Sequence, residues 1–157
     1  MDRSNEIQEI IDRESRAFDT ADVELMLSVY HPDMVWAWPP HSRAYDPMDW
    51  IMRMGRFNYD RWYKQTQLFF DTHTLIHNKR ETQKIVMSDE QDGAFAVVDV
   101  DTLFRQAQDK DSPWHDDGDG AGELHILGRA CKIYTTVNGE WKMLYQPGTM
   151  HYPVEAC

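Results

Sequence analysis

The feature that most constrains the fold is a change in the spacing of hydrophobic residues near Thr72. Before this point apolar residues recur at the intervals of amphipathic helices, whereas after it they alternate with polar residues as in β-strands. Helices followed by antiparallel strands are typical of α+β proteins, in which the helices pack on one face of the sheet. The chain of 157 residues contains no repeat and no linker, so we expect a single domain over residues 1–157.

The helical half is expected to contain three helices and one short strand. Proline and short polar segments mark the ends of these elements. The expected elements are a first helix from Ser4 to Phe18 capped by Ser4 or Asn5, a second helix with Val23, Met26, Leu27 and Tyr30 on its inner face that ends at His31–Asp33, a strand Met34–Trp38, and a third helix from about Pro47 that carries Trp50, Ile51 and Met54.

The second half is expected to form long antiparallel strands. An Asn-Gly pair at Asn138 and Gly139 is the signature of a tight hairpin turn. The expected elements are one long or broken strand from about Thr72, a turn Asp89–Gly93, a strand Ala94–Gln106, a loop Asp109–Gly122, a strand Glu123–Thr136 and a last strand Glu140–Gln146.

Composition excludes several classes of protein. A net charge of −11 would repel nucleic-acid phosphates, so no nucleic-acid partner is expected. No apolar run is long enough to cross a bilayer, and the first residues lack the basic and apolar segments of a signal peptide. Cys131 and Cys157 are too few for a disulfide framework. We therefore expect a cytoplasmic protein without a membrane partner.

Glu14 falls on the apolar stripe of the first helix. It lies seven residues after Ile7 and three after Ile11, and Phe18 follows one turn later. A buried carboxylate is costly unless it is paired, hydrogen-bonded or protonated. Glu14 therefore lies either at a solvent-exposed edge of the helix or inside the molecule, where the carboxyl group would have a structural or functional role.

Three stretches resemble the SnoaL-like branch of the nuclear transport factor 2-like superfamily: Arg16–Trp36, Ser88–Arg105 and Gly128–Gly148. The resemblance implies a cone in which a bent antiparallel sheet wraps around the N-terminal helices and encloses a cavity. It also implies a homodimer. Activities in the superfamily include those of ketosteroid isomerase, scytalone dehydratase, limonene epoxide hydrolase and polyketide cyclases, whereas the kinase II association domain is a non-catalytic binding and assembly module.

The resemblance does not extend to the catalytic groups of ketosteroid isomerase. The position of its tyrosine is Glu14 here, its proton-shuttling aspartate matches Trp38, and its second acid falls near Ala130 or Cys131. We therefore reject steroid isomerisation by that mechanism. Trp36 and Trp38 alternate along the first strand and are either core residues or the wall of an aromatic pocket, together with Tyr30.

Two alternatives remain for the face of strand 94–106 on which Asp99 and Asp101 lie. Hydrophobic alternation puts the even-numbered face inside and both acids in water. Gapless matching to the isomerase instead puts the odd-numbered face toward the cavity, where repulsion between two carboxylates would raise one pKa and create a base. A one-residue bulge would decide between the two.

His73 and His77 would be about 13 Å apart along a strand, too far to share a metal ion. No metal is expected, and His73 is either exposed or a general acid or base in the cavity. Arg129 and Lys132 lie on opposite faces of one strand, so at most one points inward, where it would be a natural partner for Glu14.

These observations predict a protein that binds a small, mostly apolar molecule with one polar end. The leading function is a lyase, isomerase or cyclase that works by acid/base chemistry without a metal or organic cofactor. The alternative is a non-catalytic ligand-binding or oligomerisation module. The candidate catalytic groups are Glu14, His73, Asp99 and Asp101, and the candidate ligand-binding residues are Tyr30, Trp36, Trp38, Arg129 and Lys132.

Overall fold

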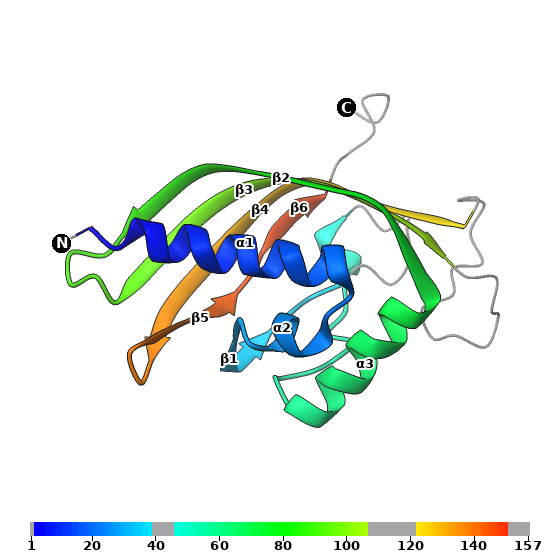
Figure 1. Cartoon of the computed structure of the whole chain (residues 1–157), viewed down its shortest axis with the longest axis horizontal. Helices are drawn as coiled ribbons and strands as arrows, with labels where there is room; N and C mark the ends of the chain where they lie inside the picture. Colours follow the sequence, from blue (N-terminus) through cyan, green and yellow to red (C-terminus); the bar gives the residue numbers. More distant parts are fainter. Residues whose placement is uncertain (1, 39–45, 107–121, 151–157) are drawn as a thin grey trace.

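The computed structural model describes residues 2–38, 46–106 and 122–150, and it has the predicted α+β architecture (Figure 1). A bent sheet curves over α1, and α2 and α3 pack below that helix (Figure 1). The elements are α1 (Ser4–Thr20), α2 (Val23–Leu27), β1 (Tyr30–Val35), a 3-10 turn η1 (Pro47–Asp49), α3 (Tyr59–Thr72), β2 (His73–Met87), β3 (Gly93–Gln106), β4 (Glu123–Val137), β5 (Glu140–Tyr145) and β6 (Gly148–Met150).

The sheet has the strand order β1-β5-β4-β3-β2, and β6 pairs with β4. The long strands β2 to β5 are antiparallel as predicted, but β1 runs parallel to β5. The predicted hairpin at Asn138 and Gly139 is confirmed, with φ angles of 52° and 82° that suit this pair of residues. The predicted loop Asp109–Gly122 lies outside the described residues, except for Gly122.

The first helix forms because its apolar stripe packs against the sheet, and it ends where Ala21 adopts a left-handed conformation. The cap predicted at Ser4 or Asn5 is wrong. Arg3 occupies the N-cap position without a side-chain cap, and the Ser4 hydroxyl bonds Asp2 at 2.9 Å instead.

Other boundaries also differ from those predicted, and the first strand is β1 (Tyr30–Val35) rather than Met34–Trp38. The second helix ends at Leu27, because the chain turns into β1 and the Val29 carbonyl accepts a hydrogen bond from Met143 N at 2.7 Å. The third helix does not begin near Pro47, where there is only a 3-10 turn. Gly55 has a φ of 65°, which is incompatible with a helix, and α3 starts after Asn58, whose side chain accepts a hydrogen bond from Arg61 N at 2.9 Å.

Two β-bulges in β2 decide which of its side chains point inward. The pairing with β3 skips one residue between Leu75 and His77 and another between Thr82 and Lys84. Each extra residue reverses the alternation of faces. As a result His73 is buried on the inner side, whereas His77 lies on the outer face.

Strand β3 pairs with β4 without any register shift, so its alternation is unbroken. Its even-numbered side chains, from Ala94 to Phe104, are buried against the helices. Within the described ranges, no helix is both long and apolar enough to cross a membrane.

Candidate functional site

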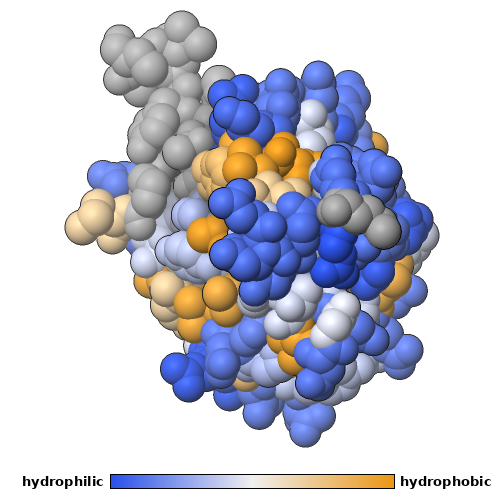
Figure 2. Space-filling model, turned by 90° about the vertical axis from the view of Figure 1, so that its left-hand side faces the viewer, coloured by the Kyte–Doolittle hydropathy of each residue, from blue (hydrophilic) through white to orange (hydrophobic). Residues whose placement is uncertain are grey.

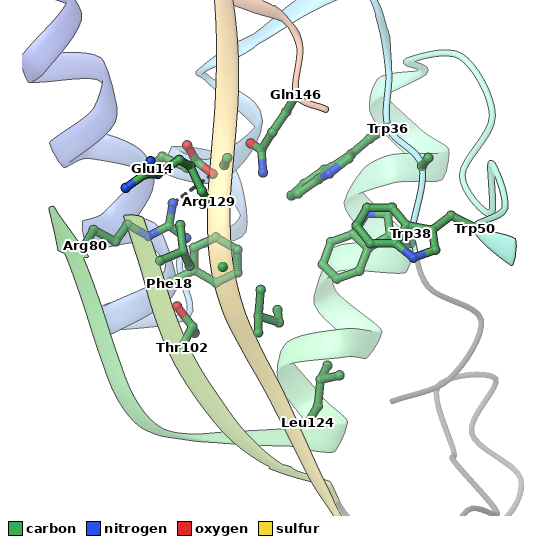
Figure 3. A pocket seen from close by; sticks show the side chains of 15 residues that line it. Glu14, Phe18, Trp36, Trp38, Trp50, Arg80, Thr102, Leu124, Arg129 and Gln146 are labelled. Carbon is green, nitrogen blue, oxygen red and sulfur yellow. Dashed lines mark hydrogen bonds and ion pairs between the residues drawn. The ribbon is translucent and has the colours of Figure 1, made fainter. Parts of the chain in front are cut away.

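A pocket with a cavity volume of about 80 Å³ opens between α1 and the inner face of the sheet. Its two ends differ in chemistry (Figure 3). Tryptophans wall one end, and polar side chains of Glu14, Arg80 and Gln146 lie at the other. The remaining wall is mostly apolar, which is typical of small-molecule sites. The lining residues are Glu14, Phe18, Trp36, Ala37, Trp38, Trp50, Arg80, Val100, Thr102, Leu124, Ile126, Gly128, Arg129, Ala130 and Gln146.

Glu14 is paired with two cations at the polar end. Its side chain is 1% exposed, and its carboxylate accepts hydrogen bonds from Lys132 Nζ at 2.6 Å and from Arg80 at 3.3 Å. Lys132 is fully buried and also donates to Gln146 Oε1 at 2.9 Å. Helix α1 and strands β2 and β4 thus each contribute one charge to this cluster, so Glu14 is not at a wet edge.

The cluster carries an excess positive charge. Burial is the largest influence on Glu14, but Lys132 and Arg80 together outweigh it and lower the pKa of the Glu14 carboxyl below its usual 4.5. Burial, assisted by Arg80 and opposed by Glu14, lowers the pKa of Lys132 to about 8. At neutral pH Glu14 and Lys132 are therefore both charged, and the Glu14 carboxylate is shared between Lys132 and Arg80.

Arg80 is the cation of this cluster that lines the pocket. Its side chain is 9% exposed, lies 4.9 Å from the centre of the Phe18 ring and donates to Asn78 Oδ1 at 3.3 Å. Glu14 is the only carboxylate that it pairs with in the described part of the chain. The inward direction of Arg80 was missed from the sequence, because the bulge at Ile76 changes the face on which it lies.

The aromatic end combines side chains from two segments. Trp36 and Trp38 are each 8% exposed, and their ring centres are 4.6 Å apart. They follow β1 rather than lying within it, and Trp38 forms an isolated β-bridge with Ile51. Trp50 completes the wall (Figure 3). Tyr30 contacts Trp36 and lines a smaller neighbouring pocket rather than this one.

His73 is buried instead of exposed, but it does not line the pocket. Its ring stacks on Phe69 with 4.1 Å between ring centres, and Nδ1 lies 2.9 Å from the Phe69 carbonyl oxygen. Burial lowers its pKa, and the bond to Phe69 opposes this shift. The structure therefore places His73 in the core beside α3, away from Glu14.

The gapless matching that placed Asp99 and Asp101 inside is wrong, because the unbroken register of β3 keeps its odd-numbered side chains on the outer face. Arg129 borders the pocket, but its guanidinium bonds Asp99 across the strands at 2.7 Å. Asp101 Oδ1 lies 2.7 Å from a nitrogen of His77 and 2.7 Å from a nitrogen of His125. Of the predicted charged site residues, Glu14 and Lys132 come together inside the molecule, whereas Asp99 and Arg129 pair on the outer face of the sheet.

A helix-filled, bent sheet with an enclosed polar cluster defines the class of small α+β cones of the nuclear transport factor 2-like type. The chain belongs to the SnoaL-like domain family, whose model matches residues 1–145. No curated protein matches the sequence at a significant level.

Solved structures show the same fold at low sequence identity. A ketosteroid isomerase-like protein from Erwinia carotovora atroseptica is 14% identical, with a TM-score of 0.61 over 94% of this chain and 95% of that chain. A nuclear transport factor 2-like protein of unknown function from Prochlorococcus marinus is 9% identical, with a TM-score of 0.59 over 99% and 98%. A hexachlorocyclohexane dehydrochlorinase is 14% identical, with a TM-score of 0.60 over 95% and 85%.

Proposed function

We propose that this protein binds a small, largely apolar molecule with an anionic or carbonyl end, and acts on it as a cofactor-independent lyase, isomerase or cyclase. The observation that carries the proposal is the position of Glu14, held between Arg80 and Lys132 at the polar end of an aromatic pocket. The apolar body of the ligand would lie against Trp36 and Trp38, and its polar end would meet Arg80.

Each charged group would have a distinct part in proton transfer. Glu14 stays ionised at neutral pH despite its burial, because Lys132 and Arg80 outweigh the effect of burial on its pKa. Its carboxylate would accept a proton from a carbon next to a carbonyl, and the electron pair of the broken C–H bond would move to the carbonyl oxygen as an enolate. Arg80 would stabilise the negative charge that develops on the substrate oxygen, which is a favourable interaction in a site that excludes water. Lys132 would position Glu14 and does not line the pocket.

A pair of matched probes tests the binding part of the proposal. We expect naphthalene-2-carboxylate to bind at least about tenfold more tightly than 2-naphthalenemethanol at neutral pH, because a charge-assisted hydrogen bond to Arg80 adds about 1.5–3 kcal/mol. This advantage should shrink as the pH rises through about 8, where Lys132 loses its proton and the excess positive charge disappears. Isothermal titration calorimetry across this range measures both affinities.

The Arg80→Met variant should bind the two probes with similar affinity, and Arg13→Met, which changes a half-buried arginine of α1 outside the pocket lining, is the matched control. Equal affinity of both probes in the wild type would contradict the proposal that the ligand has an anionic end.

Proton transfer is tested with 2-tetralone in deuterated buffer. NMR should show hydrogen–deuterium exchange faster than in buffer alone for the wild type, and exchange at the rate of buffer alone for Glu14→Gln. Binding without exchange would favour the non-catalytic alternative.

We also propose that the chain forms a homodimer through the outer face of the sheet. Apolar side chains form a row across four strands there, because Val86 pairs with Phe95, Phe95 with Ile133, and Ile133 with Tyr145. Each is at least 36% exposed, and such a row normally has a covering partner. Figure 2, which views the end of the molecule that carries the N-terminus, shows hydrophobic patches between hydrophilic residues.

Sedimentation at micromolar concentration should give twice the chain mass of 18.5 kDa. Phe95→Lys should shift the protein to the monomer, because a charge in the middle of the row opposes its burial. Met48→Lys is the control, since Met48 is 87% exposed and lies in η1, away from this row. A wild-type monomer at all concentrations would contradict the proposal.

A further inference from the structure

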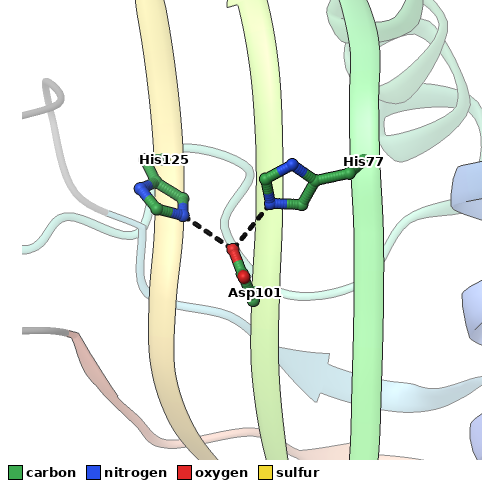
Figure 4. Close-up of side chains that lie close together, drawn as sticks. All are labelled: His77, Asp101 and His125. Carbon is green, nitrogen blue, oxygen red and sulfur yellow. Dashed lines mark hydrogen bonds and ion pairs between the residues drawn. The ribbon is translucent and has the colours of Figure 1, made fainter.

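We propose that His77, Asp101 and His125 form a binding site for a divalent transition metal ion on the outer face of the sheet. The three side chains come from the adjacent strands β2, β3 and β4 and point toward one another (Figure 4). One ligand atom from each lies within 4.8 Å of the others.

The register of the sheet assembles this site. His77 pairs with Leu103 on one side, and His125 pairs with Leu103 on the other. Asp101 precedes Leu103 by two residues and so points to the same face. The bulge at Ile76 is essential, because it brings His77 to the outer face while His73 remains buried. His73 and His77 therefore lie on opposite faces of the sheet. His77 instead lies close to Asp101 and His125.

The distances are close to those of a coordinated ion. The nitrogens of His77 and His125 each lie 2.7 Å from Asp101 Oδ1. An ion with bonds of about 2.0–2.2 Å needs ligand atoms about 3.0–3.5 Å apart, so the carboxylate would move back slightly and the imidazoles would move closer together. Exposed fractions of 31%, 35% and 44% for His77, Asp101 and His125 leave the side chains free to make this change.

The donor set selects the class of metal. Two imidazole nitrogens and one carboxylate oxygen suit zinc, nickel, cobalt or ferrous iron, whereas calcium and magnesium prefer oxygen ligands alone. Three protein ligands on an open surface leave at least one position for water. Asp101 points away from the pocket that Val100 and Thr102 line, so the metal site is separate from the proposed function at Glu14.

Titration of chelator-treated protein with Zn²⁺ tests the proposal by calorimetry. We expect one equivalent of Zn²⁺ to bind and to raise the melting temperature, since the ion would tie three strands of the folded state together. His125→Gln and Asp101→Asn should each weaken binding by at least about tenfold, because loss of a direct ligand exceeds the usual effect of outer-shell changes. The double variant His77→Gln/His125→Gln should abolish the binding of this equivalent.

His31→Gln is the matched control, because His31 lies in β1 outside this cluster and should leave the affinity unchanged. Shifts of the His77 and His125 ring protons in NMR spectra should report the same titration. Circular dichroism of each variant establishes that it is folded. Absence of saturable binding in the wild type, or an unchanged affinity in the double variant, would overturn the proposal whatever the outcome of the pocket experiments.

Discussion

Replacing Glu14 with glutamine should lower the free energy of unfolding by about 3–5 kcal/mol, the usual cost of removing one partner from a buried ion pair. The loss is large because Lys132 is fully buried and Arg80 nearly so, and both would be left without their shared carboxylate. Urea unfolding followed by circular dichroism measures the difference from the wild type.

The same experiment has two controls. Glu9→Gln removes an exposed carboxylate of the same helix, which pairs with Arg13, and should cost less than about 1 kcal/mol. Lys132→Met should cost less than Glu14→Gln, because Glu14 keeps Arg80 and a buried charge is removed. A Glu14→Gln variant as stable as Glu9→Gln would contradict the buried pairing.

The effect should depend on pH in a defined direction. The pKa of Glu14 is lowered in the folded protein, so its stabilising contribution is fully present above the usual carboxyl value of 4.5. The contribution is lost as the pH falls from that value through the lower folded-state pKa. The difference between wild type and Glu14→Gln should therefore shrink in strongly acidic solution.

A second pair of variants distinguishes pocket wall from core. Trp62→Ala should cost about 3–5 kcal/mol of stability, because Trp62 is fully buried and its loss leaves a cavity. Its indole nitrogen also donates to the Met54 carbonyl at 3.1 Å. Trp38→Ala should remain folded and bind naphthalene-2-carboxylate at least about tenfold more weakly, because Trp38 forms part of the apolar wall.

Thermal melts and probe titrations of the two variants separate these outcomes. The contrary result, in which Trp38→Ala unfolds the protein as severely as Trp62→Ala, would mean that Trp38 fills the core. Trp38→Phe is a useful intermediate, since it keeps an aromatic wall with less volume and should bind the probe with intermediate affinity.

The order of elements was predictable because it depends on local patterns. The helical stripe around Ile7 and Ile11 indicated both α1 and the burial of Glu14, and the alternation of strand 94–106 correctly placed Asp99 and Asp101 outside. These patterns arise from the fixed side-chain periods of helices and strands, which the chain carries in any surroundings. The errors in the predicted boundaries were concentrated at helix ends. His31 lies in β1 because strand pairing ends the second helix earlier, and Pro47 begins only a 3-10 turn because the conformation of Gly55 prevents a continuous helix.

The sequence by itself determined the fold class and the place of Glu14 on the apolar stripe of α1, and it offered Arg129 or Lys132 as the partner of this acid. Only the tertiary structure decided that Arg80 joins them, that His73 stays in the core and that His77 meets Asp101 and His125. These outcomes depend on the bulges in β2 and on partners 66 and 118 residues from Glu14. A bulge changes the face of every later side chain without a distinctive local pattern, so the contacts it creates are set by packing of the whole sheet.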